Sequence, residues 1–405
     1  MKAVRRRRLA LVVPNLAGGG GVQAVGRFLK NVAVRSGDFD LRLVSLSESS
    51  RDPTSLCLTS PGSWWKGPGV MRGEWEGLPY AHVGAVAGEL EFQRYRTRRA
   101  LTVLLADCDV IQMVCGFPAW ANAVLGLGKP VAMHVATRAR QERRLRDSQL
   151  RTPSDFWRKA MTTVTNRMDD SALLGVDAIQ VMNPWMFEYA KVLNAGRNVD
   201  VQYLPPGIDA EAFRPAARGS SIPAATVLCV GRFSDPRKNI GLLLEAFAKL
   251  PDRVRGQARL VLAGSVPPEA FGIRAAILGL RDRIDFVEQP DPPTLLRLYQ
   301  RASVFALPSD EEGFGMVLLE AMACGVPVVS TRSGGPEGII TDGLDGYLVP
   351  RNDASALSAR LAQLLGDVTR ATAMGATARR TVEQRYDERV LGQSFVDLWH
   401  RLGNG

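Results

Sequence analysis

The sequence predicts an α/β fold built from two doubly wound, Rossmann-like domains. Short apolar runs typical of buried parallel strands alternate with amphipathic helical stretches, and this pattern occurs twice along the chain. A link at residues 203–209, with two prolines followed by a glycine, separates the two sets because it suits neither a helix nor a strand. We therefore expect domains over residues 1–205 and 206–385, and a final segment, 386–405, that packs back on the first domain.

Each predicted strand is a short apolar run bounded by polar or turn residues, which is the pattern of a strand buried on both faces. In the first domain the predicted strands cover residues 9–13, 41–45, 110–114, 131–134 and 178–182. In the second domain they cover residues 226–230, 259–263, 284–287, 304–307, 326–330 and 346–349.

The stretches between these runs carry apolar residues at helical spacing. The predicted helices cover residues 22–34, 95–106, 240–250, 293–301, 316–324, 354–365 and 387–402. Residues 47–86 lack such a period and are rich in glycine, proline and tryptophan, so we expect a long loop there and take it as a candidate acceptor loop.

Composition restricts the class of protein. The 405 residues are 46% hydrophobic and 23% charged, which is ordinary for a globular chain, and no apolar run approaches the ~20 residues of a membrane-spanning helix. The basic N-terminus leads into an apolar run that ends at Pro14, which favours a first buried strand over a signal peptide. The five cysteines form no CxxC pair, so we expect a reducing, cytoplasmic location without a zinc site.

The formal net charge of +10 is concentrated between residues 138 and 167. This stretch predicts either a solvated helical face or a surface drawn to an anionic acceptor or to the inner face of an anionic membrane, as a peripheral contact. We find no nucleic-acid-binding motif and expect no nucleic-acid partner. The charged residues considered are Arg140, Arg143, Arg144, Arg146, Arg151, Arg158 and Lys159, against Glu142, Asp147 and Asp155.

Residues 310–320 carry the most chemistry. The strand at 304–307 ends at a Pro-Ser pair and is followed by a Gly-Phe-Gly loop that opens into a helix, so helix-start N–H groups face an anion site. Glu312 lies in the loop, and Glu320 lies one turn into the helix with its side chain leaning back toward the loop. A phosphate on the amides, with sugar hydroxyls on the two carboxylates, is the arrangement that a sugar nucleotide needs.

Three motifs in order resemble the retaining glycosyltransferases of family 4, which have the GT-B fold. They are the Gly-Arg to Lys-Asn stretch at 231–239, the loop with its acid pair at 312–320, and Ser-Gly-Gly-Pro-Glu at 333–337. In the first domain the resemblance is limited to the glycine loop at 18–21, His134 after a strand, and the 205–209 link. It implies two Rossmann-like domains facing a cleft, with the nucleotide on the second domain and the acceptor on the first.

The resemblance also implies roles for individual residues. Glu320 corresponds to the acid that binds the ribose hydroxyls, and Glu312 to the acid near the donor sugar. Arg232 and Lys238 correspond to the two cations that neutralise the diphosphate, although Arg237 competes with Lys238 for that role because the spacing from Arg232 is one residue longer than in many relatives.

Further roles fall on the backbone and on the first domain. His134 corresponds to a histidine near the donor sugar, and Gly19 and Gly20 to the glycine loop that lets the backbone approach the donor. The loop amides expected to hold sugar and diphosphate are those of Phe314, Gly315, Met316 and Val317.

No metal or cofactor is expected beyond the donor itself. The triplet 107–109 has the letters Asp-Cys-Asp of a metal loop but directly precedes a predicted strand, so we interpret it as the start of that strand. The resemblance implies a metal-independent enzyme, in which Arg232 and Lys238 replace a divalent cation.

The expected function is retaining transfer of a sugar from a UDP- or GDP-sugar to a hydroxyl of a glycan, glycolipid, lipid-linked sugar or small metabolite, in carbohydrate biosynthesis. Two alternatives remain: a nucleotide-sugar 2-epimerase on the same fold, and an inactive glycosyltransferase-like binding subunit. Departures at Pro206, at 135–136 and at 287–291, where relatives often have other residues, leave the donor base and the acceptor open.

Overall fold

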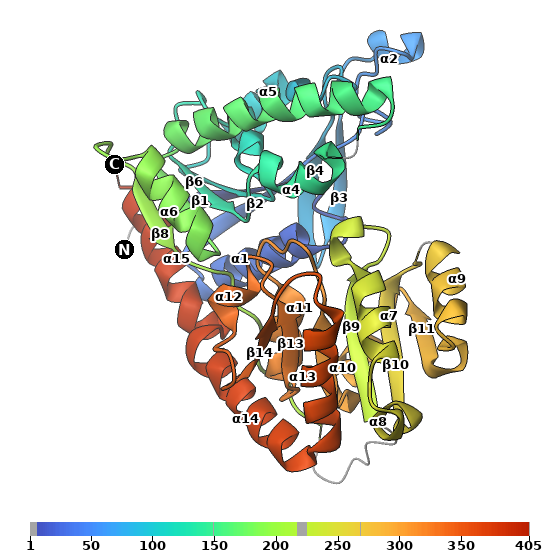
Figure 1. Ribbon diagram of the computed structural model, residues 1–405. Helices are drawn as coiled ribbons and strands as arrows, with labels where there is room; N and C mark the ends of the chain where they lie inside the picture. Colours follow the sequence, from blue (N-terminus) through green and yellow to red (C-terminus); the bar gives the residue numbers. More distant parts are fainter. Residues whose placement is uncertain (1–5, 149, 217–224, 268, 405) are drawn as a thin grey trace. The chain divides into compact units, whose positions relative to one another are not determined.

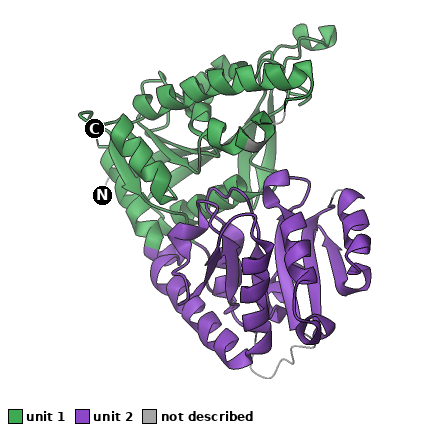
Figure 2. Ribbon diagram, viewed as in Figure 1, with its two compact units in different colours: residues 1–207, 391–405 green, residues 208–390 purple. Residues whose placement is uncertain are grey.

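The computed structural model describes residues 6–148, 150–216, 225–267 and 269–404. The chain divides into two compact units (Figure 2): unit 1 comprises residues 1–207 and 391–405, and unit 2 comprises residues 208–390. The first boundary thus falls after residue 207 rather than after 205, and the return to unit 1 begins at 391 rather than 386.

Unit 1 is built on an eight-stranded sheet with the order β3-β4-β2-β1-β5-β6-β7-β8 (Figure 1). All neighbouring strands are parallel except β3 and β4, which form an antiparallel pair at the edge. The strands are β1 (Arg7–Pro14), β2 (Phe39–Leu46), β3 (Val70–Trp75), β4 (Leu78–Val83), β5 (Val110–Cys115), β6 (Val131–Val135), β7 (Ala178–Val181) and β8 (Asp200–Tyr203).

The helices of unit 1 connect these strands and cover the sheet. They are α1 (Gly21–Ser36), α2 (Pro61–Trp64), α3 (Arg99–Leu105), α4 (Ala139–Asp147), α5 (Pro153–Gly175) and α6 (Pro184–Leu193), with 3-10 turns η1 (Glu91–Tyr95) and η2 (Pro118–Ala123). The predicted helix at 95–106 is therefore wrong in its first part, where residues 96–98 are extended between η1 and α3.

The prediction of a loop over residues 47–86 is also wrong. This segment contains α2 and the β3–β4 hairpin, and β4 lies inside the sheet beside β2. The hairpin turns at Glu76 and Gly77, both of which have positive φ angles (48° and 79°). A two-residue turn of this kind matches the twist of the flanking strands and so favours a hairpin.

A C-terminal helix, α15 (Glu388–Leu402), returns the chain to unit 1. The indole N–H of Trp399 donates a hydrogen bond of 2.8 Å to the side-chain oxygen of Gln112 on β5, and both residues are completely buried. Phe395 packs edge-on against Phe28 of α1, with ring centroids 5.4 Å apart. The helix therefore forms part of the core of unit 1.

Unit 2 is built on a six-stranded, wholly parallel sheet with the order β11-β10-β9-β12-β13-β14. Each strand predicted from the sequence is present in one sheet or the other, with ends that differ by at most two residues. The strands are β9 (Ala225–Arg232), β10 (Ala258–Ser265), β11 (Ile284–Glu288), β12 (Val304–Leu307), β13 (Val328–Thr331) and β14 (Gly346–Val349).

Helices surround the sheet of unit 2 (Figure 1). The long helix α14 was not predicted, because its mixed polar sequence has little apolar periodicity. The helices are α7 (Ile240–Ala248), α8 (Asp252–Gln257), α9 (Glu269–Ile277), α10 (Pro292–Arg301), α11 (Met316–Ala323), α12 (Pro336–Ile339), α13 (Ala354–Gly366) and α14 (Val368–Arg385), with 3-10 turns η3 (Pro236–Lys238) and η4 (Arg281–Arg283).

Candidate functional site

The candidate site lies where the strand order of unit 2 reverses. From β9 the chain builds outward through β10 and β11 on one side, and then through β12, β13 and β14 on the other. In open parallel sheets the connections at such a point leave in opposite directions, which opens a ligand site at the carboxyl ends of the two central strands. Arg232 ends β9, and the loop to α11 follows β12.

Two of the predicted residues contact each other directly at this point. The ammonium of Lys238 lies 2.6 Å from the Oε2 atom of Glu312, and the side chains are only 19% and 15% exposed. The hydroxyl of Ser309 lies 3.4 Å from the same carboxylate oxygen. Because the pair is partly shielded from water, the attraction between its charges is stronger than it would be in bulk solvent. The pair places a cation and an acid at the carboxyl ends of the strands.

The structure also separates Lys238 from Arg237. The guanidinium of Arg237 is held by Asp235 at 2.7 Å, within the short η3 turn. Burial would raise the pKa of Asp235, but the hydrogen bonds and charge of Arg237 outweigh it and leave that pKa lowered. Arg232 has an exposed side chain, and among the described residues it makes no ion pair. Arg232 is therefore exposed to a ligand, whereas Lys238 and Arg237 each already contact an acid, and the choice of Lys238 as the second cation stays a prediction.

A second loop holds the Glu312 loop in place. The amide of Glu312 donates to the carbonyl of Ser333 at 2.9 Å, and the amide of Gly335 donates to the carbonyl of Glu312 at 2.8 Å. A side chain at Gly335 would place its Cβ only 2.4 Å from the carbonyl oxygen of Phe314. The Gly-Gly motif at 333–337 therefore supports the loop by allowing two backbones to approach closely.

The predicted amide cradle lies at the start of α11. Gly315 precedes the helix with φ of 107°, a value that favours glycine, and supplies no side-chain cap. Phe314 is buried with its ring 6.2 Å from that of Tyr386, whereas Met316 and Val317 are half-buried. An uncapped helix start of this kind suits an anion, because the first N–H groups lack intrahelical acceptors.

Glu320 lies on the second turn of α11 and is half-buried. Its Oε2 atom accepts a hydrogen bond of 2.6 Å from the hydroxyl of Tyr299, on the last turn of α10. Tyr299 is completely buried, and burial together with the charge of Glu320 raises its pKa well above the usual value. Sequence analysis missed Tyr299. Its position on the apolar face of α10 was a signal for burial, but nothing in the sequence identified the partner of its hydroxyl.

The remaining predicted residues belong to unit 1. Gly19 and Gly20 are exposed in the loop between β1 and α1. Gly20 has φ of 132°, and a Cβ built on Gly19 meets no atom within 4 Å. The loop conformation thus needs glycine at 20, and the backbone at 19 is accessible. A role of either glycine in donor binding stays a prediction.

The position of His134 differs from the expected one after a strand, and its contact with the donor sugar stays a prediction. His134 lies inside β6, is completely buried, and its Nε2 atom lies 3.0 Å from the carbonyl oxygen of Leu204. Its ring lies 5.8 Å from that of Phe395 on α15. Because β6 continues through Val135, His134 is a strand residue directed at α15 rather than the first residue of a loop. Burial lowers the pKa of His134 to about 4.

This burial makes the protein sensitive to acid. The pKa of a histidine is about 6.5 in the unfolded chain, and folding lowers it here. The unfolded state therefore takes up a proton first, and the free energy of unfolding falls as the pH drops from about 6.5 toward 4. With a folded pKa of about 4, the loss is about 2 kcal/mol at about pH 5. We expect His134→Gln, which keeps a donor for Leu204, to remove most of this loss. Urea denaturation at about pH 7 and pH 5 measures it, and an equal acid loss in the variant would contradict the assignment.

The described residues contain no group of three or more His, Cys, Asp or Glu side chains arranged to hold a metal ion. The triplet 107–109 directly precedes β5, with Asp107 paired to Arg8 and Arg42, and Cys108 completely buried. Its side chains are thus engaged within unit 1, as expected for the start of a strand.

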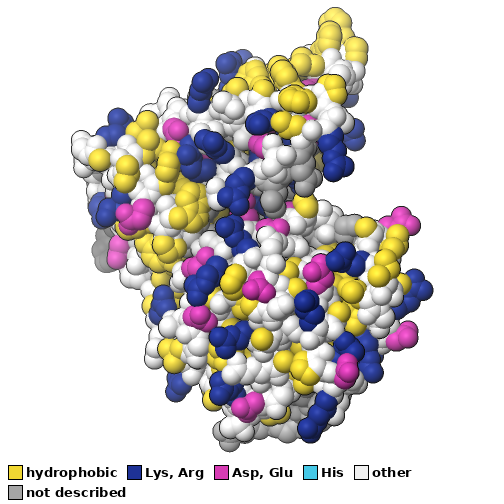
Figure 3. All heavy atoms as spheres, viewed as in Figure 1, with side chains coloured by type: hydrophobic (Ala, Val, Ile, Leu, Met, Phe, Trp, Pro, Cys, Tyr) yellow, Lys and Arg dark blue, Asp and Glu magenta, His cyan; other side chains and the backbone are white. Residues whose placement is uncertain are grey.

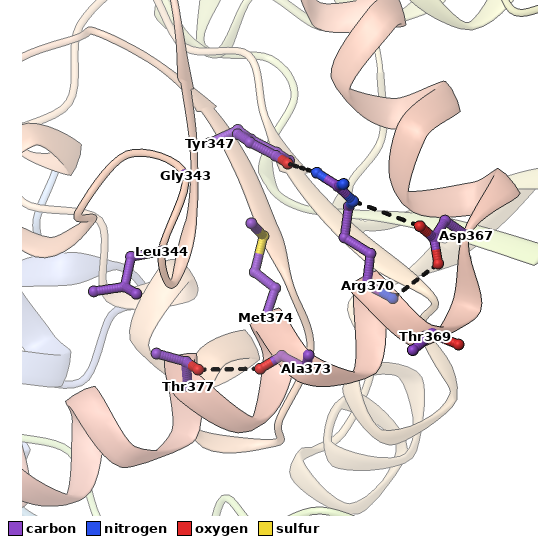
Figure 4. A pocket seen from close by; sticks show the side chains of 9 residues that line it. All are labelled: Gly343, Leu344, Tyr347, Asp367, Thr369, Arg370, Ala373, Met374 and Thr377. Atoms are coloured by element: carbon purple, nitrogen blue, oxygen red, sulfur yellow. Dashed lines mark hydrogen bonds and ion pairs between the residues drawn. The ribbon is translucent and has the colours of Figure 1, made fainter.

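One pocket of unit 2 is lined by none of the residues predicted for the donor site. It has a volume of about 450 Å³ and lies between the start of β14 and the first half of α14 (Figure 4). Within it, Arg370 donates to the hydroxyl of Tyr347 at 3.4 Å. The lining residues are Gly343, Leu344, Tyr347, Asp367, Thr369, Arg370, Ala373, Met374 and Thr377.

Comparison with known proteins places these observations in a family. Residues 217–381 match the family model described as glycosyl transferases group 1. Unit 2 belongs to the glycosyl transferases group 1. The resemblance predicted from the 231–239, 312–320 and 333–337 motifs is thereby confirmed, since all three lie within the matched residues.

Two curated relatives match about half of this chain. One is a GDP-mannose-dependent alpha-(1-6)-phosphatidylinositol monomannoside mannosyltransferase of Mycolicibacterium smegmatis, 32% identical over 218 residues, which are 50% of this chain and 57% of that protein. Another is a D-inositol 3-phosphate glycosyltransferase of Acidothermus cellulolyticus, 32% identical over 229 residues, which are 52% of this chain and 51% of that protein. The chain thus spans about half the length of these curated relatives.

Solved structures match over nearly the whole chain. A sucrose-phosphate synthase from Thermosynechococcus elongatus has a TM-score of 0.70 at 22% identity and covers 98% of this chain and 99% of its own. The Anabaena protein HepE in complex with UDP-glucose has a TM-score of 0.71 at 16% identity and covers 97% of this chain and 99% of its own. At these identities the likeness concerns the fold, and the predicted GT-B class is confirmed.

Proposed function

We propose that this protein transfers a sugar from a nucleotide diphosphate donor to an acceptor hydroxyl with retention of anomeric configuration. The main observation in support is the arrangement of charged residues at the carboxyl ends of the central strands of unit 2. An exposed cation at Arg232, a close Lys238–Glu312 pair and a start of α11 without a side-chain cap all lie at the carboxyl ends of β9 and β12. Glu320 lies on the second turn of the same helix.

The reaction explains why these residue types occur together. Breaking the bond between the sugar and the diphosphate leaves negative charge on the phosphate oxygens, which Arg232, Lys238 and the α11 amides stabilise. Glu312 holds Lys238 in place before the donor binds, and a phosphate then replaces the carboxylate as a partner of the ammonium. In retention through same-face attack, the departing phosphate takes the proton of the acceptor hydroxyl.

The proposal includes a UDP- or GDP-sugar as donor and a glycan, glycolipid or small metabolite as acceptor. The matched relatives named for GDP-mannose and the fold neighbour bound to UDP-glucose support these two donor classes. We further propose that the two cations make a divalent metal unnecessary, so EDTA leaves the activity unchanged. The five free thiols suit work in the reducing cytoplasm.

Thermal-shift measurements with GDP, UDP, ADP and TDP test the donor site. We expect GDP or UDP to raise the melting temperature, because a ligand that binds only the folded state stabilises it. Incubation with GDP-mannose or UDP-glucose, with and without a sugar acceptor, then distinguishes a glycosyltransferase from a nucleotide-sugar epimerase. Transfer to the acceptor supports the proposal, and release of an isomerised sugar without any acceptor indicates an epimerase. No stabilisation by any nucleotide overturns the donor site.

We also propose a peripheral contact between unit 1 and an anionic membrane, through part of the basic stretch. Three of its cations are already paired within the protein: Arg138 with Asp170, Arg143 with Glu91, and Arg158 with Asp155. The exposed cations without an ion pair among the described residues are Arg140, Arg144, Arg146, Arg151, Lys159 and Arg167. The interpretation of the whole stretch as one basic surface is thus too broad.

The exposed face of α5 combines charge with aromatic side chains. Phe156 and Trp157 are 61% and 55% exposed, and Lys159 and Arg167 follow on the same helix. Figure 3 shows hydrophobic and basic side chains together over unit 1. Aromatic rings suit the boundary between water and lipid, and lysine or arginine suits anionic headgroups. No described helix is both long and apolar enough to cross a membrane.

Co-sedimentation with phosphatidylcholine vesicles, with and without phosphatidylglycerol, tests this contact. We expect binding only to the anionic vesicles, and a loss of about tenfold or more in Lys159→Glu/Arg167→Glu, since each surface cation contributes ~1 kcal/mol. The matched control is Arg253→Glu/Arg281→Glu, which changes two exposed cations of unit 2 by the same charge. Equal losses in both variants would show that only net charge matters and would contradict a specific face.

A further inference from the structure

Glu320 is held by a buried tyrosine. The Tyr299 hydroxyl donates to Oε2 of Glu320 at 2.6 Å, within the range of a charge-assisted O–H···O⁻ hydrogen bond. Tyr299 comes from α10 and Glu320 from α11, so the contact joins two helices on either side of β12 in the chain. The hydroxyl is the only polar atom of the Tyr299 side chain, and its direction is fixed by the ring.

The ring of Tyr299 is buried among other aromatic rings. It is completely buried, with its centroid 5.8 Å from that of Phe305 on β12 and 6.1 Å from that of Phe213. Because burial and the nearby carboxylate raise the pKa of Tyr299 well above its usual value, the phenol keeps its proton and remains a donor at any physiological pH. A buried hydroxyl without a partner would be costly, so the ring position and the carboxylate position are coupled.

We propose that Tyr299 is a positioning residue for nucleotide recognition: by holding Oε2 of Glu320, it fixes the carboxylate in the orientation that accepts the ribose hydroxyls of a nucleoside diphosphate. This inference rests on the donor site proposed above and adds to it the residue that orients its ribose acid. A flexible glutamate would lose rotamer freedom each time it bound a ribose. A glutamate held beforehand loses less, so the restraint improves affinity for ribonucleotides.

The proposal concerns the ribose and not the base or the phosphates. Tyr299→Phe removes one oxygen atom and keeps the buried ring, so the core packing is preserved. We expect the affinity for GDP or UDP, whichever binds the wild-type protein more tightly, to fall about tenfold. The 2′-deoxy and 3′-deoxy forms of the same nucleotide each lack one ribose hydroxyl. For the form that lacks the hydroxyl bound by Glu320, we expect Tyr299→Phe to change the affinity less than about twofold.

Isothermal titration of the full chain with these nucleotides measures the effect. We expect the wild-type protein to bind the ribonucleotide more tightly than at least one deoxy form. Tyr299→Phe should lower the ratio of these two affinities. Glu320→Ala abolishes the ratio, and Tyr299→Phe adds nothing in the Glu320→Ala background, because a residue that acts only through Glu320 has no effect without it. An additive double variant overturns the proposal.

Tyr386→Phe is the matched control. Tyr386 is also a buried tyrosine of unit 2, and its hydroxyl donates to the carbonyl of Gly338 at 2.7 Å instead of to a carboxylate. We expect this variant to lower the melting temperature as Tyr299→Phe does, while leaving the ratio between ribonucleotide and deoxynucleotide unchanged. A loss of affinity in Tyr299→Phe that is equal for all the nucleotides indicates a structural role and overturns the positioning role. Absence of any nucleotide binding by the wild-type protein overturns the donor site itself.

Discussion

Lys238→Ala is expected to lower kcat/KM for the donor sugar by about 10²- to 10³-fold, the usual cost of removing one group that stabilises charge developing in a transition state. The loss has two sources. The diphosphate loses a cation at the carboxyl edge of the sheet, and Glu312, which lies 2.6 Å from Lys238, is left as an uncompensated, largely buried acid beside the leaving group. Initial rates with GDP-mannose and UDP-glucose measure the effect.

Lys249→Ala is the control for this variant. Lys249 follows the last residue of α7, the helix that begins after Lys238, and its ammonium donates to the hydroxyl of Ser355 at 3.2 Å on the surface. We expect its removal to change kcat/KM less than about twofold, as is usual for exposed charges. A Lys238→Ala enzyme within about threefold of wild type would show that the diphosphate does not lie against Lys238.

The two acids of the site are expected to separate binding from chemistry. Glu320→Ala should weaken nucleotide binding by about 10- to 100-fold, since it removes a charged acceptor of ribose hydrogen bonds. Glu312→Ala should leave nucleotide binding unchanged or slightly tighter, because it removes a negative charge near the phosphates, and should lower kcat by about 10²-fold. Calorimetry gives the first quantity, and rates at saturating donor give the second.

The contrast between the two variants is the test. If both acids affect binding alone, Glu312 does not act on the donor sugar, and the carboxylate serves only to hold Lys238. If neither variant changes binding or rate by more than about threefold, the nucleotide does not occupy the start of α11. Melting temperatures of both variants check that each is folded.

The sequence predicted the core of unit 2 well because its strands are buried on both faces. Runs such as 304–307 are apolar at every position, which is the pattern of a parallel strand buried on both faces. The pairing of Lys238 with Glu312 follows from the order of the strands rather than from any local pattern. The two residues meet because β9 and β12 are neighbours in the sheet although they are far apart in the chain.

The errors have physical causes of the same kind. The β3–β4 hairpin was missed because its first strand is mostly exposed and lacks an apolar alternation, so only the turn at Glu76 and Gly77 marked it. His134 was expected after a strand, but β6 continues through Val135 and the histidine ring packs near Phe395 of α15. Because α15 joins unit 1 from the far end of the sequence, no local pattern around His134 indicated this partner.

The Trp399–Gln112 hydrogen bond has a consequence for how the protein is made. Unit 1 cannot complete its core until residues 391–405 have left the ribosome, after the whole of unit 2 has been synthesised. Nascent chains of this protein therefore carry an unfinished first unit for most of translation, although domains usually mature in order from the N-terminus. A fragment that stops at residue 390 should expose the sheet face that Trp399 covers and depend on chaperones for its survival.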